Sequence, residues 1–305
     1  MPEIHDLRSF IRRLESAGQL VRVQRPVNLE YELADVAAAL ERRRRPAPLF
    51  EMVNGSRWPI FSSAVASQTR AALALGCERE KVVEVMRHAL EPANGIPPVR
   101  FDESTGASEV AGATEAAGAI EAAWKANVVT GDEVDVRRLP IPTHAVGDGG
   151  PFITGGVVIS KDPVSGRGNL SYNRMQVKNA RQFGFNVNEW RHVREFLDAQ
   201  EAKDEPLPVA VAIGLDPAIM IAAGARYPDD ELLIAGAIRG AGIPVSRGVT
   251  VDIDIPAEAE IVIEGYLGAH ERQAEGPLAE FHGYFGELWE SPVFHVTAVC
   301  WRDEP

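Results

Sequence analysis

Two glutamates flank a Gly-Pro step in the segment EGPLAEFHGYFG, residues 275–286. Glu275 and Glu280 are acids in a stretch whose other residues are mostly apolar or small. Burial of a carboxyl group costs free energy unless the group is paired, and a proton-transfer site is a place where that cost serves a purpose. The segment therefore predicts that Glu275 and Glu280 are catalytic carboxyl groups.

A second polar cluster lies in NLSYNRMQV, residues 169–177. In an extended strand Asn169 and Ser171 share one face, because side chains alternate with a period of two. Arg174 lies on the opposite face unless the chain bends, and its planar fork suits a carboxylate. Taken alone, the segment is equally typical of an exposed edge strand.

Two further candidates lie on predicted helices, namely His192 in EWRHVREF and Glu231 in PDDELLIAGAIRG. A lone histidine on a helix is more often hydrogen-bonded than metal-bound. Acids at the start of a helix are often explained by their favourable interaction with the helix dipole. Together with Asn169, however, they provide an amide oxygen, an imidazole and a carboxylate. Mg²⁺ or Mn²⁺ accepts such a set, usually with phosphate oxygens completing the shell. Asn169, His192 and Glu231 are therefore candidate metal ligands.

The elements that must position these residues fall into two parts, with a domain boundary predicted near residue 110. In the first part, helical and strand patterns predict a small α/β layer. The second part is rich in strands. Its loop lengths differ, and no G-x-G-x-x-G opens a helix after a strand, which favours a barrel or mixed sheet over a doubly wound sheet. The predicted strands of this part are residues 152–160, 170–177, 209–213, 260–266 and 293–301, and the predicted helices are about 189–203, 216–225 and 229–238.

The chain resembles the UbiD family of decarboxylases, which depend on prenylated FMN. The resemblance begins at DLRSFIRRLESAGQLVRV, becomes specific in LPIPTHAVGDGGPFITGGVVISKDPVSGRGNLSYNRMQV and ends with EGPLAEFHGYFG. It implies an α+β fold in which a small N-terminal α/β domain, residues 1–110, precedes a split β-barrel flavin-binding domain, residues 111–305. The family's C-terminal oligomerisation domain is expected to be absent from this chain.

The resemblance also implies roles for individual residues. The family's N-x-S-x-x-R motif matches at Asn169, Ser171 and Arg174, and its E-G-P-x-x-E motif matches at Glu275 and Glu280. Arg174, Glu275 and Glu280 then correspond to the family's Glu-Arg-Glu catalytic network. The implied metal ligands for Mn²⁺ or Mg²⁺ are Asn169, His192 and Glu231, with K⁺ nearby, and the implied cofactor-binding residues are Asn169, Ser171, Arg174, Met175 and His192.

The activity implied by the resemblance is the reversible non-oxidative decarboxylation of an α,β-unsaturated, aromatic or heteroaromatic carboxylic acid. Arg174 would orient the substrate and Glu280 would donate the proton, and a flavin prenyltransferase would supply the cofactor. By position, Asn188 and Arg191 would lie near the substrate, which favours a ring that can hydrogen-bond. An arginine at position 191 that simply points to solvent is the alternative.

Two other functions are compatible with parts of the sequence. A noncatalytic cofactor-binding or assembly subunit would bind the flavin and need a partner chain or the missing domain for turnover. A two-carboxylate hydrolase of the glycosidase type would use Glu275 and Glu280, but it leaves Asn169, His192 and Glu231 unexplained.

The bulk composition narrows the class of protein. The chain has 305 residues and a formal net charge of −13, which argues against nonspecific nucleic-acid binding. Its two cysteines, Cys77 and Cys300, form no disulfide framework or zinc cluster, and both are expected to be buried. The N-terminus has no apolar signal core, and no stretch approaches the roughly 18 apolar residues of a membrane span. We therefore expect a soluble cytoplasmic protein without membrane contact, which could form a homo-oligomer.

Overall fold

The computed structural model describes residues 4–102, 107–108, 122–280 and 282–305. The α-helices of the described residues are α1 (Leu7–Ser16), α2 (Glu32–Arg42), α3 (Gln68–Leu75), α4 (Val82–Ala89), α5 (His192–Glu201), α6 (Pro217–Ala222) and α7 (Glu231–Arg239). The strands of the N-terminal part are β1 (Leu20–Val23), β2 (Ala47–Phe50), β3 (Ile60–Phe61), β4 (Val99–Asp102) and β5 (Ala107–Ser108). The later strands are β6 (Asn127–Thr130), β7 (Phe152–Ile153), β8 (Val157–Lys161), β9 (Gly168–Tyr172), β10 (Met175–Asn179), β11 (Gln182–Phe185), β12 (Leu207–Ile213), β13 (Pro244–Arg247), β14 (Asp254–Pro256), β15 (Ile261–Glu275) and β16 (Trp289–Trp301).

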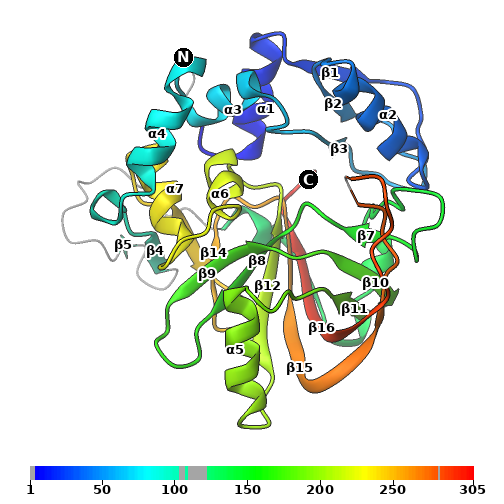
Figure 1. Ribbon diagram of the computed structural model, residues 1–305, viewed down its shortest axis with the longest axis vertical. Helices are drawn as coiled ribbons and strands as arrows, with labels where there is room; N and C mark the ends of the chain where they lie inside the picture. The colour runs from blue at the N-terminus through cyan, green and yellow to red at the C-terminus, as the bar shows by residue number, and fades with distance from the viewer. Residues whose placement is uncertain (1–3, 103–106, 109–121, 281) are drawn as a thin grey trace.

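The main sheet is curled, which confirms the predicted split barrel. Its strand order is β7-β10-β11-β16-β15-β12-β8-β9, and β6 pairs with β16 (Figure 1). Strand β9 is last in this order and β10 is second, yet only Asn173 and Arg174 link them along the chain. Two residues cannot cross a flat sheet of that width, so the sheet must curl until its ends meet. The link places Arg174 at the open seam of the barrel.

Apolar side chains cover both faces of this sheet. In β12, Val209 and Val211 belong to one buried cluster, whereas Ala210 and Ala212 belong to the other, as the strand period of two requires. The first cluster also contains apolar side chains of α5, and the second contains side chains of α6, α7, β13 and β14. Burial of each large apolar side chain contributes about 1.5–3 kcal/mol, so the two clusters hold the strands that carry the site.

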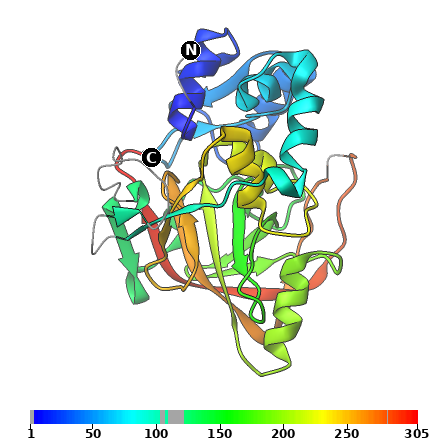
Figure 2. The same cartoon turned by 90° about the vertical axis from the view of Figure 1, so that its left-hand side faces the viewer.

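The N-terminal layer lies over one end of the curled sheet, as Figures 1 and 2 both show. Strands β1, β2 and β3 form a separate three-stranded sheet, and α1 begins at a capping box in which Asp6 and Ser9 exchange hydrogen bonds. Arg8 of α1 joins this layer to the barrel through a two-point ion pair, with 2.8 Å from Nε and from Nη2 to the carboxylate of Glu260. The N-terminal layer is therefore anchored directly beside the start of β15.

Several sequence predictions need correction or remain untested. The single strand predicted for residues 152–160 is wrong: Gly155 and Gly156 separate β7 from β8, which lie near opposite ends of the sheet order. Likewise, the segment 170–177 forms two strands, β9 and β10. Cys300 is buried as predicted, but Cys77 is only partly buried. The predicted boundary near residue 110 lies outside the described residues, and the division into two domains remains a prediction.

No helix among the described residues is long and apolar enough to cross a bilayer.

The sequence patterns missed helix α3. Its start is fixed by Ser67, whose side chain accepts a hydrogen bond from the Arg70 amide, and its end is fixed by Gly76 in a left-handed conformation.

Candidate active site

Arg174 contacts both predicted catalytic glutamates. The bend between β9 and β10 directs its side chain to the end of β15 and the segment that follows. Its Nε and Nη2 lie 2.9 Å and 3.0 Å from Oε1 and Oε2 of Glu275, and its Nη1 lies 2.5 Å from Oε1 of Glu280. The side chain of Glu275 is fully buried, whereas that of Glu280 is 35% exposed. One acid is therefore locked in place and the other is open to solvent.

A chain of hydrogen bonds connects this network to the strand that carries the motif N-x-S-x-x-R. The Ser171 hydroxyl donates to Asn173 Oδ1 at 2.8 Å, and Asn173 Nδ2 donates to the Asn186 carbonyl at 2.9 Å. Asn186 Nδ2 in turn donates to Glu275 Oε2 at 3.3 Å. The sequence analysis missed Asn173 and Asn186. For Asn186 the sequence offered one signal, namely that this polar residue comes immediately after the largely buried strand QFGF, residues 182–185.

Asn169 and His192 also meet. Asn169 Oδ1 lies 2.9 Å from His192 Nδ1, and the imidazole stacks on the ring of Phe196 one turn along α5, with 6.3 Å between ring centroids. Because an amide oxygen only accepts, Nδ1 carries the proton in this arrangement. The amide oxygen of Asn169 is thus hydrogen-bonded to the imidazole at the first residue of α5, a helix that has no side-chain cap.

Glu231 contacts the backbone of the strand that carries Asn169. It is the first residue of α7 and only 2% exposed, and its Oε2 accepts a hydrogen bond of 2.7 Å from the amide of Leu170, the neighbour of Asn169. Burial raises the pKa of Glu231 from 4.5 to about 7. Among the described residues no cationic side chain forms an ion pair with Glu231, although Arg167 is close enough to oppose the rise in its pKa. An amide oxygen, an imidazole and a buried carboxylate are a donor set that fits a hard divalent cation.

The predicted ligands Asn169, His192 and Glu231 differ from a metal site built only from acids or from Cys and His. Within the described ranges, no group of three or more His, Cys, Asp or Glu side chains is placed to hold a metal ion. The Asn169 cluster lies outside that pattern because one of its three members is an amide.

The remaining predicted residues occupy different environments. Ser171 is buried on the same face of β9 as Asn169, since Leu170 and Tyr172 pack into the opposite apolar cluster. The side chain of Met175 is fully buried in the apolar cluster that contains side chains of α5, away from the polar side chains of the candidate site. Asn188 and Arg191 are both exposed on the turn before α5, where the Arg191 amide donates to the Asn188 carbonyl at 3.2 Å.

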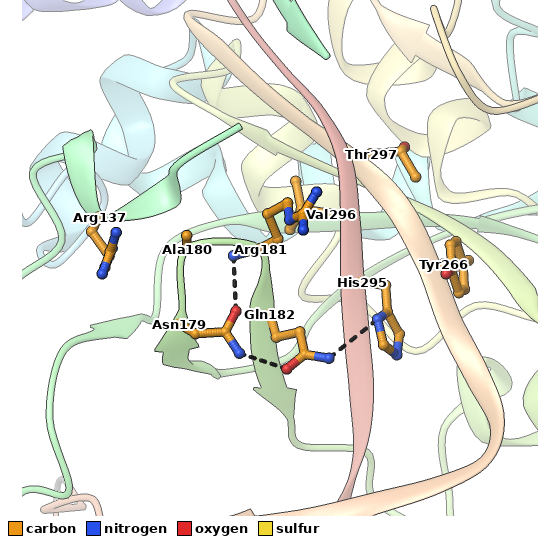
Figure 3. Close-up of a pocket in the computed structure, with 9 residues that line it drawn as sticks. All are labelled: Arg137, Asn179, Ala180, Arg181, Gln182, Tyr266, His295, Val296 and Thr297. Atoms are coloured by element: carbon orange, nitrogen blue, oxygen red, sulfur yellow. Dashed lines mark hydrogen bonds between the residues drawn. The ribbon is translucent and has the colours of Figure 1, made fainter. Parts of the chain in front are cut away.

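Two cavities of the described structure are not lined by the Glu-Arg-Glu residues. The larger, about 570 Å³, is formed by the turn at residues 179–181 together with β11, β15 and β16 (Figure 3). Its basic side chains already have partners, because Arg137 pairs with Asp135, Arg181 with Asp132 and His295 with Glu271. A smaller cavity of about 90 Å³ is lined by Ser160, Asn169 and Asp230, next to the predicted metal ligands.

The curled sheet with two polar clusters at its seam defines a split-barrel protein with a Glu-Arg-Glu site. The chain belongs to the UbiD family. Residues 118–305 match the 3-octaprenyl-4-hydroxybenzoate carboxy-lyase Rift-related domain, and residues 11–90 match the N-terminal domain of the same enzyme family.

Solved structures of the family are similar over nearly the whole chain. An evolved dimeric form of the UbiD-class enzyme HmfF from Pelotomaculum thermopropionicum, in complex with prFMN, is 32% identical with a TM-score of 0.88, and the match covers 99% of this chain and 66% of HmfF. The apo 3,4-dihydroxybenzoic acid decarboxylase of Enterobacter cloacae is 31% identical with a TM-score of 0.87, covering 99% of this chain and 64% of that one. Vanillic acid decarboxylase of Sedimentibacter hydroxybenzoicus in open form is 25% identical with a TM-score of 0.86, covering 100% and 63%. The chain thus spans less than two thirds of the length of these relatives.

Proposed function

We propose that this chain carries the reversible non-oxidative decarboxylation of an α,β-unsaturated, aromatic or heteroaromatic carboxylic acid with prenylated FMN as cofactor. The observation that carries the proposal is the placement of Glu275 and Glu280 on the same guanidinium, that of Arg174. Family membership supports it, as do the prFMN complex of HmfF and the aromatic acids named for the other two relatives.

The three predicted metal ligands fit the phosphate end of such a cofactor. Asn169, His192 and Glu231 would hold Mn²⁺ or Mg²⁺, and the ion would balance the phosphate in a protein whose net charge is −13. Ser171 and Arg174 lie between this end and the glutamates, and a K⁺ ion nearby is part of the proposal. When bound, the prenylated flavin supplies the electron sink that decarboxylation requires and that no side chain here provides.

The protein residues have distinct tasks in the proposed reaction. Glu275 occupies Nε and Nη2 of Arg174 and fixes the plane of the guanidinium, which then orients the substrate carboxylate. When the bond to the carboxylate carbon breaks, CO₂ leaves and the electron pair stays with the substrate. Glu280 delivers a proton to the substrate carbon that carried the carboxylate, and its exposed fraction of 35% allows it to regain a proton from solvent. Carboxylation follows the same path in reverse.

Reconstitution tests the proposal. The purified chain is mixed with prenylated FMN and Mn²⁺, and flavin absorbance and CO₂ release from aromatic acids are measured. Bound flavin with CO₂ release is the expected result. Flavin binding without turnover, with turnover restored by a partner chain or by a longer form, would favour the noncatalytic subunit. Failure to bind the flavin would overturn the proposal.

The substrate we propose is an acid whose ring carries hydrogen-bonding groups, because Asn188 and Arg191 are polar and lie on the turn that leads into His192. A panel of hydroxylated, heteroaromatic and unsubstituted cinnamic acids tests this choice. Preference for the unsubstituted acids would contradict it. The proposal further includes a flavin prenyltransferase as cofactor supplier, a cytoplasmic location and self-association.

A further inference from the structure

The turn HAVGDGG, residues 144–150, is not explained by the proposed chemistry, yet it contacts the segment that carries Glu280. Asp148 uses both carboxylate oxygens. Oδ2 accepts hydrogen bonds from the amides of His144 and Ala145 at 3.1 Å and 2.8 Å, which close the turn itself. Oδ1 accepts a hydrogen bond of 2.8 Å from the amide of Ala279, which is 131 residues away in sequence. Ala279 is the residue immediately before Glu280.

Two neighbours fasten the same segment at its other end. The Gly149 amide donates to the Pro277 carbonyl at 2.8 Å. The buried amide of Gln176 accepts from the Gly276 amide at 2.9 Å and donates to the Gly149 carbonyl at 2.7 Å. The four residues between Glu275 and Glu280 are therefore bonded at both ends to one turn and to β10.

This fastening matters because the Glu280 side chain has little support of its own. It is 35% exposed, and its hydrogen bond to Arg174 spans 2.5 Å. Its backbone amide bonds only within the same segment, to the carbonyl of Tyr284 at 2.9 Å. A shift of about 1 Å in residues 276–279 would move the carboxyl group out of contact with Arg174, and displacements of that size cost on the order of a hundredfold in rate.

We propose that Asp148 is a positioning residue that fixes the backbone of Ala279 and thereby holds Glu280 against Arg174. The catalytic consequence rests on the proposed function, whereas the structural consequence does not. All three groups bonded to the carboxylate are N–H donors, so an asparagine at this position has too few acceptor atoms for them. The substitution Asp148→Asn keeps the size of the side chain and must release the turn or Ala279.

Hydrogen–deuterium exchange of the full chain tests the fastening independently of activity. Asp148→Asn and Asp148→Ala are compared with the matched control Asp162→Asn. Asp162 likewise closes its own turn with both oxygens, through the Val164 amide and the Ser165 hydroxyl, but it forms no hydrogen bond to the described residues of the 275–286 segment. We expect exchange in the peptide containing residues 276–280 to accelerate about tenfold or more in both Asp148 variants and to remain unchanged in the control. Peptides of β15 and β16 should keep wild-type protection, which shows that the variants fold.

A second readout tests the consequence for Glu280. In the reconstituted enzyme, kcat of Asp148→Asn should fall about tenfold or more, while flavin absorbance and KM stay within about twofold of the wild type. Wild-type exchange at residues 276–280, or unchanged kcat despite faster exchange, would overturn the proposal. If the wild-type chain binds no flavin, the proposed function fails, and the exchange experiment still decides whether Asp148 holds this segment.

Discussion

Arg174 donates two parallel hydrogen bonds to the carboxylate of Glu275, at 2.9 Å and 3.0 Å, although the two residues are 101 positions apart. Glu275 is fully buried and Arg174 is 13% exposed, so the pair is shielded from water. This contact forms where the bend between β9 and β10 meets the end of β15. The remaining guanidinium nitrogen of Arg174, Nη1, is free to bond to Glu280. The pair is the fixed part of the site.

Removal of the arginine should destabilise the fold. In Arg174→Ala, Glu275 keeps its buried carboxylate but loses its cation, and the free energy of unfolding should fall by about 3–5 kcal/mol. The double variant Arg174→Ala/Glu275→Gln removes the uncompensated charge and should recover part of that loss. Urea unfolding measures both values. Equal stability of the single and double variants would show that the buried charge is not the cause.

Replacement of the proposed proton donor should abolish turnover without loss of the cofactor. We expect Glu280→Gln to lower kcat by about a hundredfold or more, since an amide cannot deliver the proton, while flavin absorbance is retained. Glu287→Gln is the matched control, because Glu287 is an exposed glutamate immediately after the 275–286 segment. Comparable kcat values for the two variants would remove Glu280 from its role.

Mn²⁺ binding to the flavin-free protein should depend on pH through Glu231. Burial raises the pKa of this carboxyl group to about 7, so between about pH 4.5 and 7 the folded protein holds a proton that the unfolded chain releases. The contribution of Glu231 to stability is thus present below pH 4.5 and is lost as the pH rises through 7.

Because Mn²⁺ requires the carboxylate, its affinity should increase from pH 6 to pH 8 with proton release. Isothermal titration in two buffers measures both quantities. Glu231→Gln should bind Mn²⁺ weakly at either pH, whereas the exposed neighbour variant Asp229→Asn should behave as the wild type. Tight binding to Glu231→Gln would exclude Glu231 as a ligand.

Gly149 should not tolerate a side chain. A Cβ at this position would overlap the carbonyl oxygen of Gly276 and the side-chain nitrogen of Gln176, so the segment before Glu280 must move. Gly149→Ala should lower the free energy of unfolding by about 1–3 kcal/mol. Gly155→Ala is the control, since an added Cβ meets nothing within 4 Å there. Thermal unfolding of the two variants compares them, and equal midpoints would contradict the packing argument.

Local patterns predicted the parts of the site that depend on neighbouring residues. The period of two placed Asn169 and Ser171 on one face of a strand, and that face is confirmed by Leu170 and Tyr172 in the opposite cluster. The direction of Arg174 could not be predicted, because it depends on a bend between strands at distant positions in the sheet. Contacts such as Asp148 to Ala279 join short polar segments of unrelated pattern, so only the folded chain reveals them.

Periodicity does not group Asn169, His192 and Glu231; their ligand chemistry and the resemblance to the UbiD family both predict that they form one site. The structure brings Asn169 to His192, and it brings Glu231 to the backbone amide of Leu170, the neighbour of Asn169. Their role as metal ligands remains a prediction.

Crystals grown with Mn²⁺ and FMN test the central claim most directly, by anomalous scattering at the manganese edge. We predict one peak in contact with Asn169 Oδ1, the His192 imidazole and the Glu231 carboxylate, with the FMN phosphate bound to the same ion and the flavin ring toward Arg174. A manganese peak away from these three side chains, or a flavin bound elsewhere on the chain, would contradict the account.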